Sequence, residues 1–428
     1  MIMFRLLFIA AILIVNTIST CRADDKNDKD DILSTNLIRW LRDNGAYIND
    51  KLVVKYNGVY RGIYATEDME VGEQLCSIPS NLMIQPDIKK ESTDEEDTIY
   101  PHCNTIKEVM KAVSADDDNT NPYGEYLKAQ PIGYLPTFWS DSAKELLITM
   151  LKSTQKEYQT DLVYYGLEYD ELPPHGIQYK LDEIQYECNI NDDMMNNPIY
   201  KQAAMLVTAR GDYEYMIPYY DMFNHNNAKY NIHHDYALDE TPEKRGFTVS
   251  KPVKAGEELF NAYNRCNICN DRLDWYGTPE MWLEYGFVES IPQRWLFDFA
   301  RVKFELEWKD GDESKEEMVV NFLVPMSSKG KRLLQEELTR LDNFATLHRH
   351  KSHEEYGDMT RFEWESLWQY YDALHNALTL ATTQSNGSLS DEVWKLSHDW
   401  WVKDGTLKEE DSEEHYVLRT KSYSNDEL

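Results

Sequence analysis

The sequence predicts an α+β fold with a strand-rich N-terminal half and a mostly helical C-terminal part. Three short apolar segments, 52–56, 61–65 and 73–79, are separated by glycine-containing turns, which is typical of strands joined in a small β structure. Farther along, leucines and aromatic residues recur at helical spacing over residues 330–344 and 362–381. Together these patterns favour a β-structured domain followed by a helical one.

Shorter helices and one buried segment are predicted around these strands. Apolar residues at 37–41 lie on one helical face, and Asn44–Gly45 ends that helix because both residues tolerate positive φ. Helices are also expected at 141–151 and 202–207. Residues 215–220 are predicted to form a buried strand or turn.

Composition limits the classes of partner. The chain has 428 residues with 42% hydrophobic residues and a net charge of −32, enough for two or three compact units. Direct nucleic-acid binding is not expected, because phosphate recognition needs a basic surface. The acidic surface either attracts a basic protein or only keeps the chain soluble.

The N-terminus has the layout of a secretory signal peptide over residues 1–23. Arg5 precedes an apolar run at 6–15, and small residues follow before residue 23. A signal anchor is the alternative, but the run is short for a membrane span. We expect no membrane span in the mature chain.

The C-terminus indicates retention in the endoplasmic reticulum lumen. Residues 425–428 read Asn-Asp-Glu-Leu, which resembles the retrieval signal of that compartment with Asn in its variable first place. In that location Asn386–Ser388 would be a glycosylation acceptor. A chance Asp-Glu-Leu ending is the competing interpretation.

Five cysteines remain after the signal peptide, too few for a disulfide scaffold. One or two bridges are expected in an oxidising lumen, with at least one thiol left over. Cys266 and Cys269 form a C-x-x-C pair without a second such pair, so we expect no metal site there and favour a disulfide or two thiols. The five are Cys76, Cys103, Cys188, Cys266 and Cys269.

Three motifs in a fixed order carry a family resemblance. Asn224–His225 is followed by Gly256–Tyr263, which reads G-E-E-L-F-N-A-Y, and then by Tyr285–Phe287, which reads Y-G-F. This order and spacing resembles the SET-domain lysine methyltransferases. Asn264–Asn270 departs from the family pattern, which commonly continues with Ser-Asn.

The N-terminal strands resemble one branch of that family, typified by the Rubisco large-subunit methyltransferase. The matching residues are Trp40–Leu41, Gly45–Ala46, Arg61–Ala65 and Ile78–Pro79. The resemblance implies a SET-domain β-fold with a knot-like cofactor pocket, a helical insertion and a mostly α-helical C-terminal domain.

The implied domain organisation has four parts. They are a signal peptide at 1–23, a SET domain at 32–290 with a helical insertion at about 100–205, a helical domain like the family's substrate-binding domain at 295–405, and a charged tail at 406–428.

The resemblance also implies S-adenosyl-L-methionine as cofactor and names the residues that would bind it. Asn224 and His225 would form the cofactor pocket, Arg210 would bind the cofactor carboxylate with its planar guanidinium, and the segment at Arg61 would offer backbone groups. Tyr263 would contact both the methyl group and the target nitrogen through weak C–H···O contacts. The alternative for each side chain is a packing or salt-bridge role.

Tyr285 and Phe287 would bind the substrate by lining the lysine channel. A lysine amine is protonated in water and must become neutral to accept a methyl group; a narrow apolar channel next to the sulfonium favours the neutral form. Asp221 is expected to order the turn before Asn224 rather than act as a base.

The sequence therefore predicts a monomeric protein-lysine N-methyltransferase that acts on a protein substrate. Two alternatives remain: a histidine methyltransferase of the same fold, and a catalytically inactive SET-type interaction module. Hydrolase motifs such as G-x-S-x-G and H-E-x-x-H are absent from the sequence.

Overall fold

The computed structural model divides the chain into two compact units, Met1–Ile132 with Glu187–Tyr263, and Gly133–Tyr186 with Asn264–Leu428. The structure describes residues 32–56, 61–85, 101–114, 121–130, 135–151, 181, 184–185, 187–212, 215–234, 244–263, 276–297, 300, 302–309, 317–324 and 326–384.

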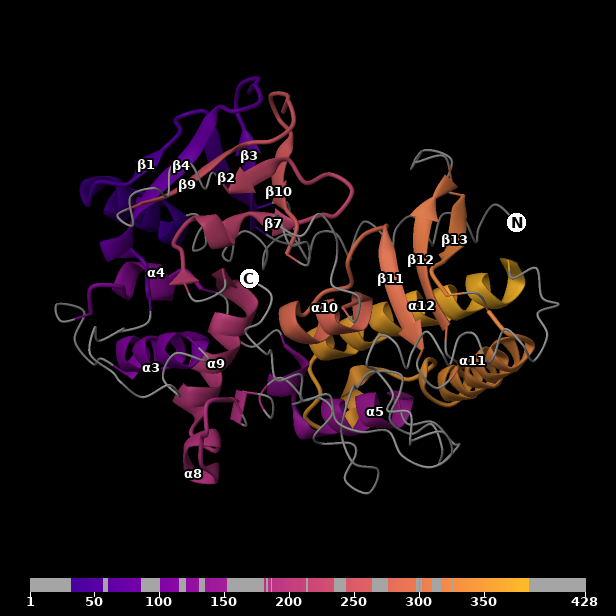
Figure 1. Ribbon diagram of the computed structural model, residues 1–428. Coiled ribbons are helices and arrows are strands. Elements are labelled where there is room, and N and C mark those ends of the chain that lie inside the picture. The colour runs from indigo at the N-terminus through magenta and orange to yellow at the C-terminus, as the bar shows by residue number, and fades with distance from the viewer. Residues whose placement is uncertain are drawn as a thin grey trace, which may run out of the picture. The chain divides into compact units, whose positions relative to one another are not determined.

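The first unit contains two four-stranded sheets (Figure 1). One has the order β1–β4–β9–β8 with every neighbouring pair antiparallel. Its inward residues, among them Cys76, Ile78 and Phe247, are fully buried. The strands are β1 (Tyr47–Ile48), β4 (Gln74–Pro79), β9 (Lys244–Val249) and β8 (Ile232–His234).

The second sheet has the order β2–β3–β10–β7 and ends in a parallel pair, β10 with β7. Ile63 and Leu259 are cross-strand partners and both are fully buried. The strands are β2 (Leu52–Tyr56), β3 (Arg61–Ala65), β10 (Glu258–Asn261) and β7 (Asn224–His225). A further two-stranded hairpin joins β5 (Gly211–Asp212) to β6 (Tyr215–Met216).

Helices of this unit lead into the strand that carries Asn224. The Asn197 side chain accepts from the Ile199 N–H and caps α9, whose first residue is Pro198, a sequence typical of a helix start. α9 packs against α3. The helices are residues 32–43, α3 (Pro101–Ser114), α4 (Gly124–Lys128), α8 (Asp192–Met195) and α9 (Pro198–Arg210), with short 3₁₀ turns η1 (Ser80–Leu82) and η4 (Tyr220–Met222).

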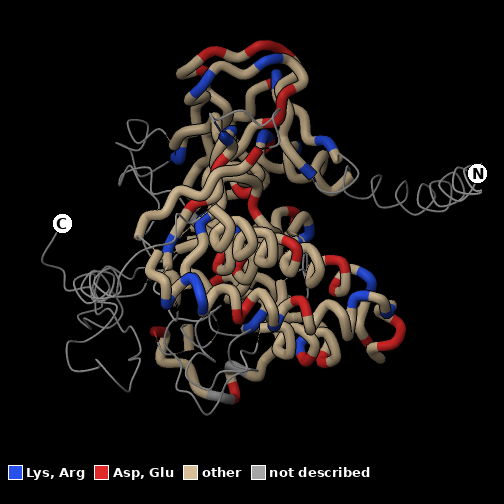
Figure 2. Tube along the Cα trace, turned by 90° about the vertical axis from the view of Figure 1, so that its right-hand side faces the viewer, with Lys and Arg blue, Asp and Glu red and all other residues tan. Residues whose placement is uncertain are grey.

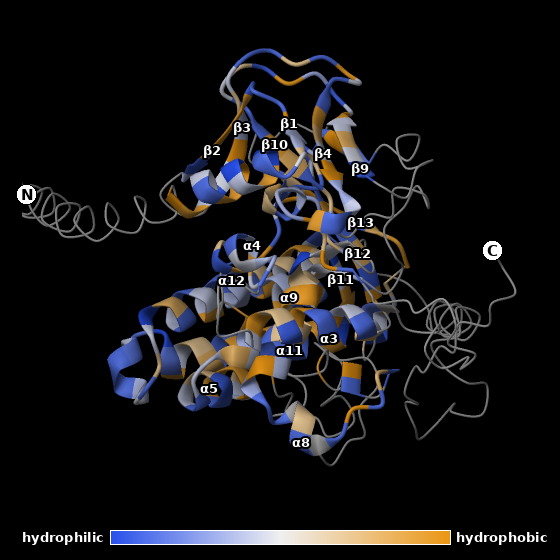
Figure 3. Cartoon of the chain, turned by 90° about the vertical axis from the view of Figure 1, so that its left-hand side faces the viewer, coloured by the Kyte–Doolittle hydropathy of each residue, from blue (hydrophilic) through white to orange (hydrophobic). Residues whose placement is uncertain are grey.

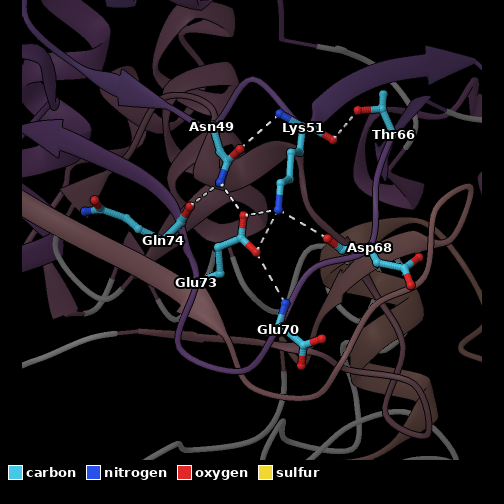
Figure 4. Close-up of polar contacts among 7 residues, drawn as sticks. All are labelled: Asn49, Lys51, Thr66, Asp68, Glu70, Glu73 and Gln74. Carbon is cyan, nitrogen blue, oxygen red and sulfur yellow. Dashed lines mark hydrogen bonds and ion pairs between the residues drawn. The ribbon is translucent and has the colours of Figure 1, made fainter.

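A polar network ties the turns at one corner of this unit together (Figure 4). Lys51 Nζ pairs with Glu73 Oε1 at 2.9 Å and donates to the Asp68 carbonyl at 3.2 Å. The Asn49 amide donates to the Gln74 carbonyl at 2.8 Å. These contacts link the segment between β1 and β2 to the turn before β4, so three separate turns share one set of hydrogen bonds.

The second unit packs helices against a three-stranded antiparallel sheet with the order β11–β12–β13. All five residues of β11 are buried. Its core joins Trp282, Trp295 and Tyr370, with the Trp282 and Tyr370 rings stacked at 4.3 Å. The elements are η2 (Pro136–Phe138), α5 (Asp141–Leu151), α10 (Thr278–Tyr285), β11 (Gln293–Phe297), β12 (Val302–Trp308), β13 (Met318–Phe322), α11 (Ser328–His348), η9 (His353–Tyr356) and α12 (Arg361–Gln384).

The described residues of both units include charges of either sign. Acidic and basic residues are interspersed along the described trace (Figure 2), and polar and apolar residues alternate along α11 and α12 (Figure 3). Amphipathic alternation of this kind lets each helix bury one face in its core. Within the described residues, no helix is both long and apolar enough to cross a membrane.

The predicted α+β class is confirmed, and the predicted strands and helices are present with close boundaries. The strands expected at 52–56, 61–65 and 73–79 are β2, β3 and β4, and the helix expected at 141–151 is α5. The sheet β11–β12–β13 lies in the part predicted to be mostly helical and was not predicted from the sequence.

Several predictions lie outside the described residues. They concern the signal peptide at 1–23, Cys266 and Cys269, Asn386–Ser388 and the tail at 406–428. The compact units divide the chain at residues 132, 186 and 263, whereas the predicted domains divide it near 290, and that organisation stays a prediction. Among the described cysteines, Cys103 and Cys188 form a disulfide and Cys76 is a buried free thiol.

Candidate functional site

The candidate site is built on the parallel pair of β7 and β10. Asn224 lies opposite Phe260, and His225 lies opposite Asn261. The Asn224 side-chain amide donates to the Arg61 carbonyl at 2.7 Å and to Glu258 Oε1 at 2.8 Å. One side chain therefore joins three strands of the second sheet.

Glu258 is the acceptor at the centre of this junction. Its second oxygen, Oε2, accepts from the Tyr64 hydroxyl at 3.0 Å. Burial raises the pKa of the Glu258 carboxyl, while the hydrogen bonds from Asn224 and Tyr64 lower it. Gly62 makes room for the carboxylate, because a Cβ there would lie 2.2 Å from Glu258 Oε1.

His225 and Tyr263 contact each other directly. The Tyr263 backbone N–H donates to His225 Nδ1 at 3.0 Å, and the two ring centroids are 5.2 Å apart. Because Nδ1 accepts this bond, the imidazole must be neutral and carry its proton on Nε2. His225 is therefore held in one tautomer by the backbone that follows β10.

The Tyr263 hydroxyl donates to the Phe223 carbonyl at 2.7 Å. Burial raises the pKa of Tyr263 to about 12, so the phenol stays protonated at neutral pH. Because the Tyr263 O–H already donates to the Phe223 carbonyl, its oxygen can only accept. The lone pairs of that oxygen can accept weak C–H···O hydrogen bonds from a neighbouring group. This geometry suits a positioning role better than proton abstraction.

Arg210 ends α9 and supports the turn before Asn224. Its Nη1 donates to the Asp221 carbonyl at 2.8 Å. The Asp221 carboxylate is buried, and its Oδ2 accepts from the Tyr126 hydroxyl at 2.8 Å and from the Gln130 amide at 2.9 Å. Asp221 therefore orders this turn, as the sequence suggested.

Burial raises the pKa of Asp221, although nearby Arg210 and the Tyr126 hydrogen bond lower it. In the described part of the chain, Asp221 Oδ1 and Gln130 Oε1 are buried without a hydrogen-bond partner. Two such acceptors on residues that are themselves hydrogen-bonded to each other favour a donor-rich group or a water as neighbour. An amine of a cofactor or substrate has that chemistry.

Arg61 contributes mainly through its backbone. Its carbonyl accepts from Asn224, whereas its guanidinium donates to the Ala129 carbonyl at 3.2 Å and to Ser34 Oγ at 3.5 Å. The side chain thus joins β3 to two helices. A direct contact of the Arg61 side chain with a cofactor stays a prediction.

The structure brings together Arg61, Arg210, Asn224, His225 and Tyr263, which all belong to the first unit. Tyr285 and Phe287 belong to the second unit, at and after the end of α10, with ring centroids 6.3 Å apart. Their role in a lysine channel stays a prediction.

Several residues that support this site were not predicted from the sequence. They are Tyr64, Tyr126, Gln130, Asn231 and Glu258. The side-chain oxygen of Asn231 accepts from the Phe260 N–H at 2.8 Å, and its amide donates to the Glu258 carbonyl at 3.2 Å. Glu258 lies within the quoted G-E-E motif, which could have indicated it; the other contacts join residues far apart in sequence and leave no local signal.

Comparison with known proteins agrees with this assembly. The SET domain family matches residues 60–264, a range that holds β3, β7, β10 and Tyr263. This part of the chain is therefore similar to a SET domain. The resemblance to SET-domain proteins inferred from the Asn224–His225 and Gly256–Tyr263 motifs is thereby confirmed.

Curated relatives include proteins named as lysine methyltransferases. The chain is 24% identical over 284 residues to the N-lysine methyltransferase setd6 of Xenopus tropicalis, covering 60% of this chain and 57% of that protein. It is 28% identical over 277 residues to the chloroplastic [fructose-bisphosphate aldolase]-lysine N-methyltransferase of Arabidopsis thaliana, covering 60% and 52%. An uncharacterized protein of Schizosaccharomyces pombe, C16C6.01c, is 24% identical over 305 residues, covering 64% and 60%.

The match spans only part of these relatives, between 52% and 60% of their lengths. A solved structure of Rubisco LSMT bound to AdoMet aligns with a TM-score of 0.44 and 13% identity, covering 88% of this chain and 97% of that one. This is a weak overall likeness.

Proposed function

We propose that this chain is a protein-lysine N-methyltransferase that uses S-adenosyl-L-methionine. The observation that carries the proposal is the assembly of Asn224, His225 and Tyr263 at the β7–β10 pair, with a neutral buried phenol bonded to the Phe223 carbonyl. The names of the relatives setd6 and [fructose-bisphosphate aldolase]-lysine N-methyltransferase support the same activity.

The donor groups of the site fit the cofactor. Arg210 uses one N–H on the Asp221 carbonyl and has further N–H groups in its planar fork for a carboxylate. Asp221 Oδ1 and Gln130 Oε1 are acceptors that suit an amino group. The proposed binding residues are Arg61, Arg210, Asn224, His225 and Tyr263.

The cofactor supplies a methyl group on a positively charged sulfur, and the chain supplies alignment. The Tyr263 hydroxyl donates its hydrogen bond to the Phe223 carbonyl. Its oxygen can therefore accept weak C–H···O contacts from the methyl group and hold the target nitrogen in line. Methyl transfer is a displacement at the methyl carbon, and holding the sulfur, the methyl group and the target nitrogen in line provides most of the rate enhancement it needs. No side chain has to form a covalent intermediate.

Methyl transfer also requires that the target amine is neutral. Burial disfavours an ammonium ion, so an apolar approach to the site would keep the amine neutral. A histidine acceptor, whose imidazole is neutral at lower pH than an amine, would need less desolvation and is the alternative substrate for the same site.

The test is transfer of an isotopically labelled methyl group from S-adenosyl-L-methionine to proteins of the secretory pathway. Label in methyl-lysine supports the proposal. Label in methyl-histidine favours the alternative acceptor. A folded chain that binds the cofactor and transfers no label to any protein would favour an inactive interaction module.

We further propose that the protein acts in the endoplasmic reticulum lumen. The apolar run at 6–15, the Asn-Asp-Glu-Leu at 425–428 and a disulfide between Cys103 and Cys188 support this location. Removal of residues 425–428 should release the protein into the culture medium. Retention without these residues would contradict the retrieval role.

A further inference from the structure

A second cluster of reactive side chains lies in the first unit, outside the residues of the candidate site. His102 and Cys103 are in the first turn of α3, and Glu187 and Cys188 precede α8. Cys103 is bonded to Cys188, and His102 Nε2 lies 2.9 Å from Glu187 Oε2. Two neighbouring residues of one segment therefore face two neighbouring residues of the other.

The side chains of this cluster are those that bind zinc. Candidate ligand atoms of His102, Cys103 and Cys188 all lie within 4.8 Å of one another. In a tetrahedral zinc site with Zn–S of about 2.3 Å, two sulfurs are separated by about 3.8 Å. The Cα atoms of Cys103 and Cys188 are 5.4 Å apart, so rotation of the thiol side chains would reach that separation without moving the backbone.

Glu187 provides an independent indication. A zinc-bound histidine usually donates its second ring N–H to a carboxylate, which fixes the ring, and Glu187 pairs with His102 in that way. The His102 and Glu187 side chains are 28% and 23% exposed, so an ion can reach them. Cys103 is buried and Cys188 is half-buried, so a small reductant can approach the disulfide at the Cys188 sulfur.

We propose that His102, Cys103 and Cys188 bind zinc when the disulfide is reduced, with Glu187 orienting the His102 ring. The thiolate of a dithiol reductant attacks one sulfur and forms a mixed disulfide. The second thiol of the reductant then displaces that cysteine and leaves as a cyclic disulfide, with Cys103 and Cys188 released as thiols. Zinc binding displaces the two thiol protons to solvent.

The two states maintain the same connection. The disulfide joins α3 to the segment before α8 and α9, and α9 packs on α3 and ends at Arg210. A zinc ion held by His102, Cys103 and Cys188 would join the same segments after reduction. The helix that positions Arg210 would therefore stay anchored in oxidising and in reducing conditions.

The experiment measures zinc binding by competition with a chromophoric chelator. It uses the mature chain with Cys266→Ser and Cys269→Ser, which removes the C-x-x-C thiols as a competing site. The reduced chain should bind one zinc per chain and the oxidised chain none. Cobalt(II) should give a thiolate charge-transfer band only in the reduced chain.

Matched variants distinguish zinc binding at this site from zinc binding elsewhere on the chain. His102→Ala should weaken zinc binding at least roughly tenfold, whereas His350→Ala, which removes an exposed histidine of the second unit, should leave it unchanged. His102→Ala keeps both cysteines, so its oxidised form is a folding control. Equal zinc affinity in the reduced and oxidised chains, or in the two histidine variants, would overturn the proposal.

Discussion

The side-chain amide of Asn224 lies 2.8 Å from Glu258 Oε1 and joins β7 to β10 through side chains as well as backbone. The same amide holds the Arg61 carbonyl on β3. Asn224 is therefore placed by two acceptors that come from strands distant in sequence. A cofactor bound at Asn224 would share a rigid support with the whole sheet.

Tyr263→Phe should separate binding from turnover. The variant loses the bond to the Phe223 carbonyl and the oxygen that would contact the methyl group, but keeps the ring against His225. We expect turnover to fall roughly 10- to 100-fold while cofactor affinity stays within about threefold. Kinetics and calorimetry on the same sample measure both. Equal losses in the two would indicate a structural role for Tyr263.

Glu258→Gln should change how stability depends on pH. The folded-state pKa of Glu258 is raised by burial, so its contribution to stability is present below the unfolded pKa of about 4.3 and is lost as pH rises through the folded value. The glutamine variant does not titrate. Its stability relative to the parent should therefore increase with pH above about 4.3 and then become constant.

Urea unfolding of both proteins at several pH values measures this difference. Glu257→Gln is the matched control, because it removes an exposed carboxylate from the neighbouring position. The explanation fails if the two variants show the same trend with pH.

Gly62→Ala should displace the Glu258 carboxylate that supports Asn224. The added Cβ would lie 2.2 Å from Glu258 Oε1, and the carboxylate would have to leave Asn224. We expect a loss of about 1–3 kcal/mol in the free energy of unfolding together with weaker cofactor binding. The double variant Gly62→Ala with Glu258→Ala removes the clash, so its cost should be less than the sum of the single costs. Simple additivity would show that the clash is not the cause.

Glu363→Ala should destabilise the second unit. Glu363 Oε1 accepts from the Ser140 N–H at 2.6 Å, and its Oε2 accepts from the Thr360 N–H at 2.6 Å. It therefore joins the start of α5 to the start of α12. Two backbone donors lose their partner in the variant, and we expect a loss of about 1–3 kcal/mol in thermal or urea unfolding.

The control for this change is Glu365→Ala on the same helix. Glu365 is exposed and pairs with exposed Arg361 at 2.7 Å, so its removal should change stability by less than about 0.5 kcal/mol. Comparable losses in the two variants would rule out the role given to Glu363.

Local patterns were enough to predict much of the fold. The run Leu52–Tyr56 and the run Arg61–Ala65 are strands, as their short length and glycine-containing flanking sequence predict. Asp141–Leu151 is a helix because its apolar residues share one face. The strand β12, Val302–Trp308, alternates apolar and charged residues and could have been predicted. β11 is buried throughout and has no alternation to reveal it.

Long-range contacts were beyond sequence reasoning. The Asn224, His225 and Tyr263 motifs indicated the site through family resemblance, but the partner of each side chain depends on strand pairing. The Cys103–Cys188 bond spans 85 residues, and pairing among several cysteines cannot be deduced from sequence alone. Likewise, nothing near Asp221 indicates that Tyr126 will donate to it.

The most direct test of the proposed function is isothermal titration of the chain from Asp24 onward with S-adenosyl-L-methionine. We predict a dissociation constant of about micromolar magnitude. Asn224→Ala should weaken it at least roughly tenfold, because Glu258 and the Arg61 carbonyl lose their shared donor. Asn343→Ala, which removes an exposed amide on α11, should leave it unchanged. A folded chain that does not bind S-adenosyl-L-methionine would contradict the account.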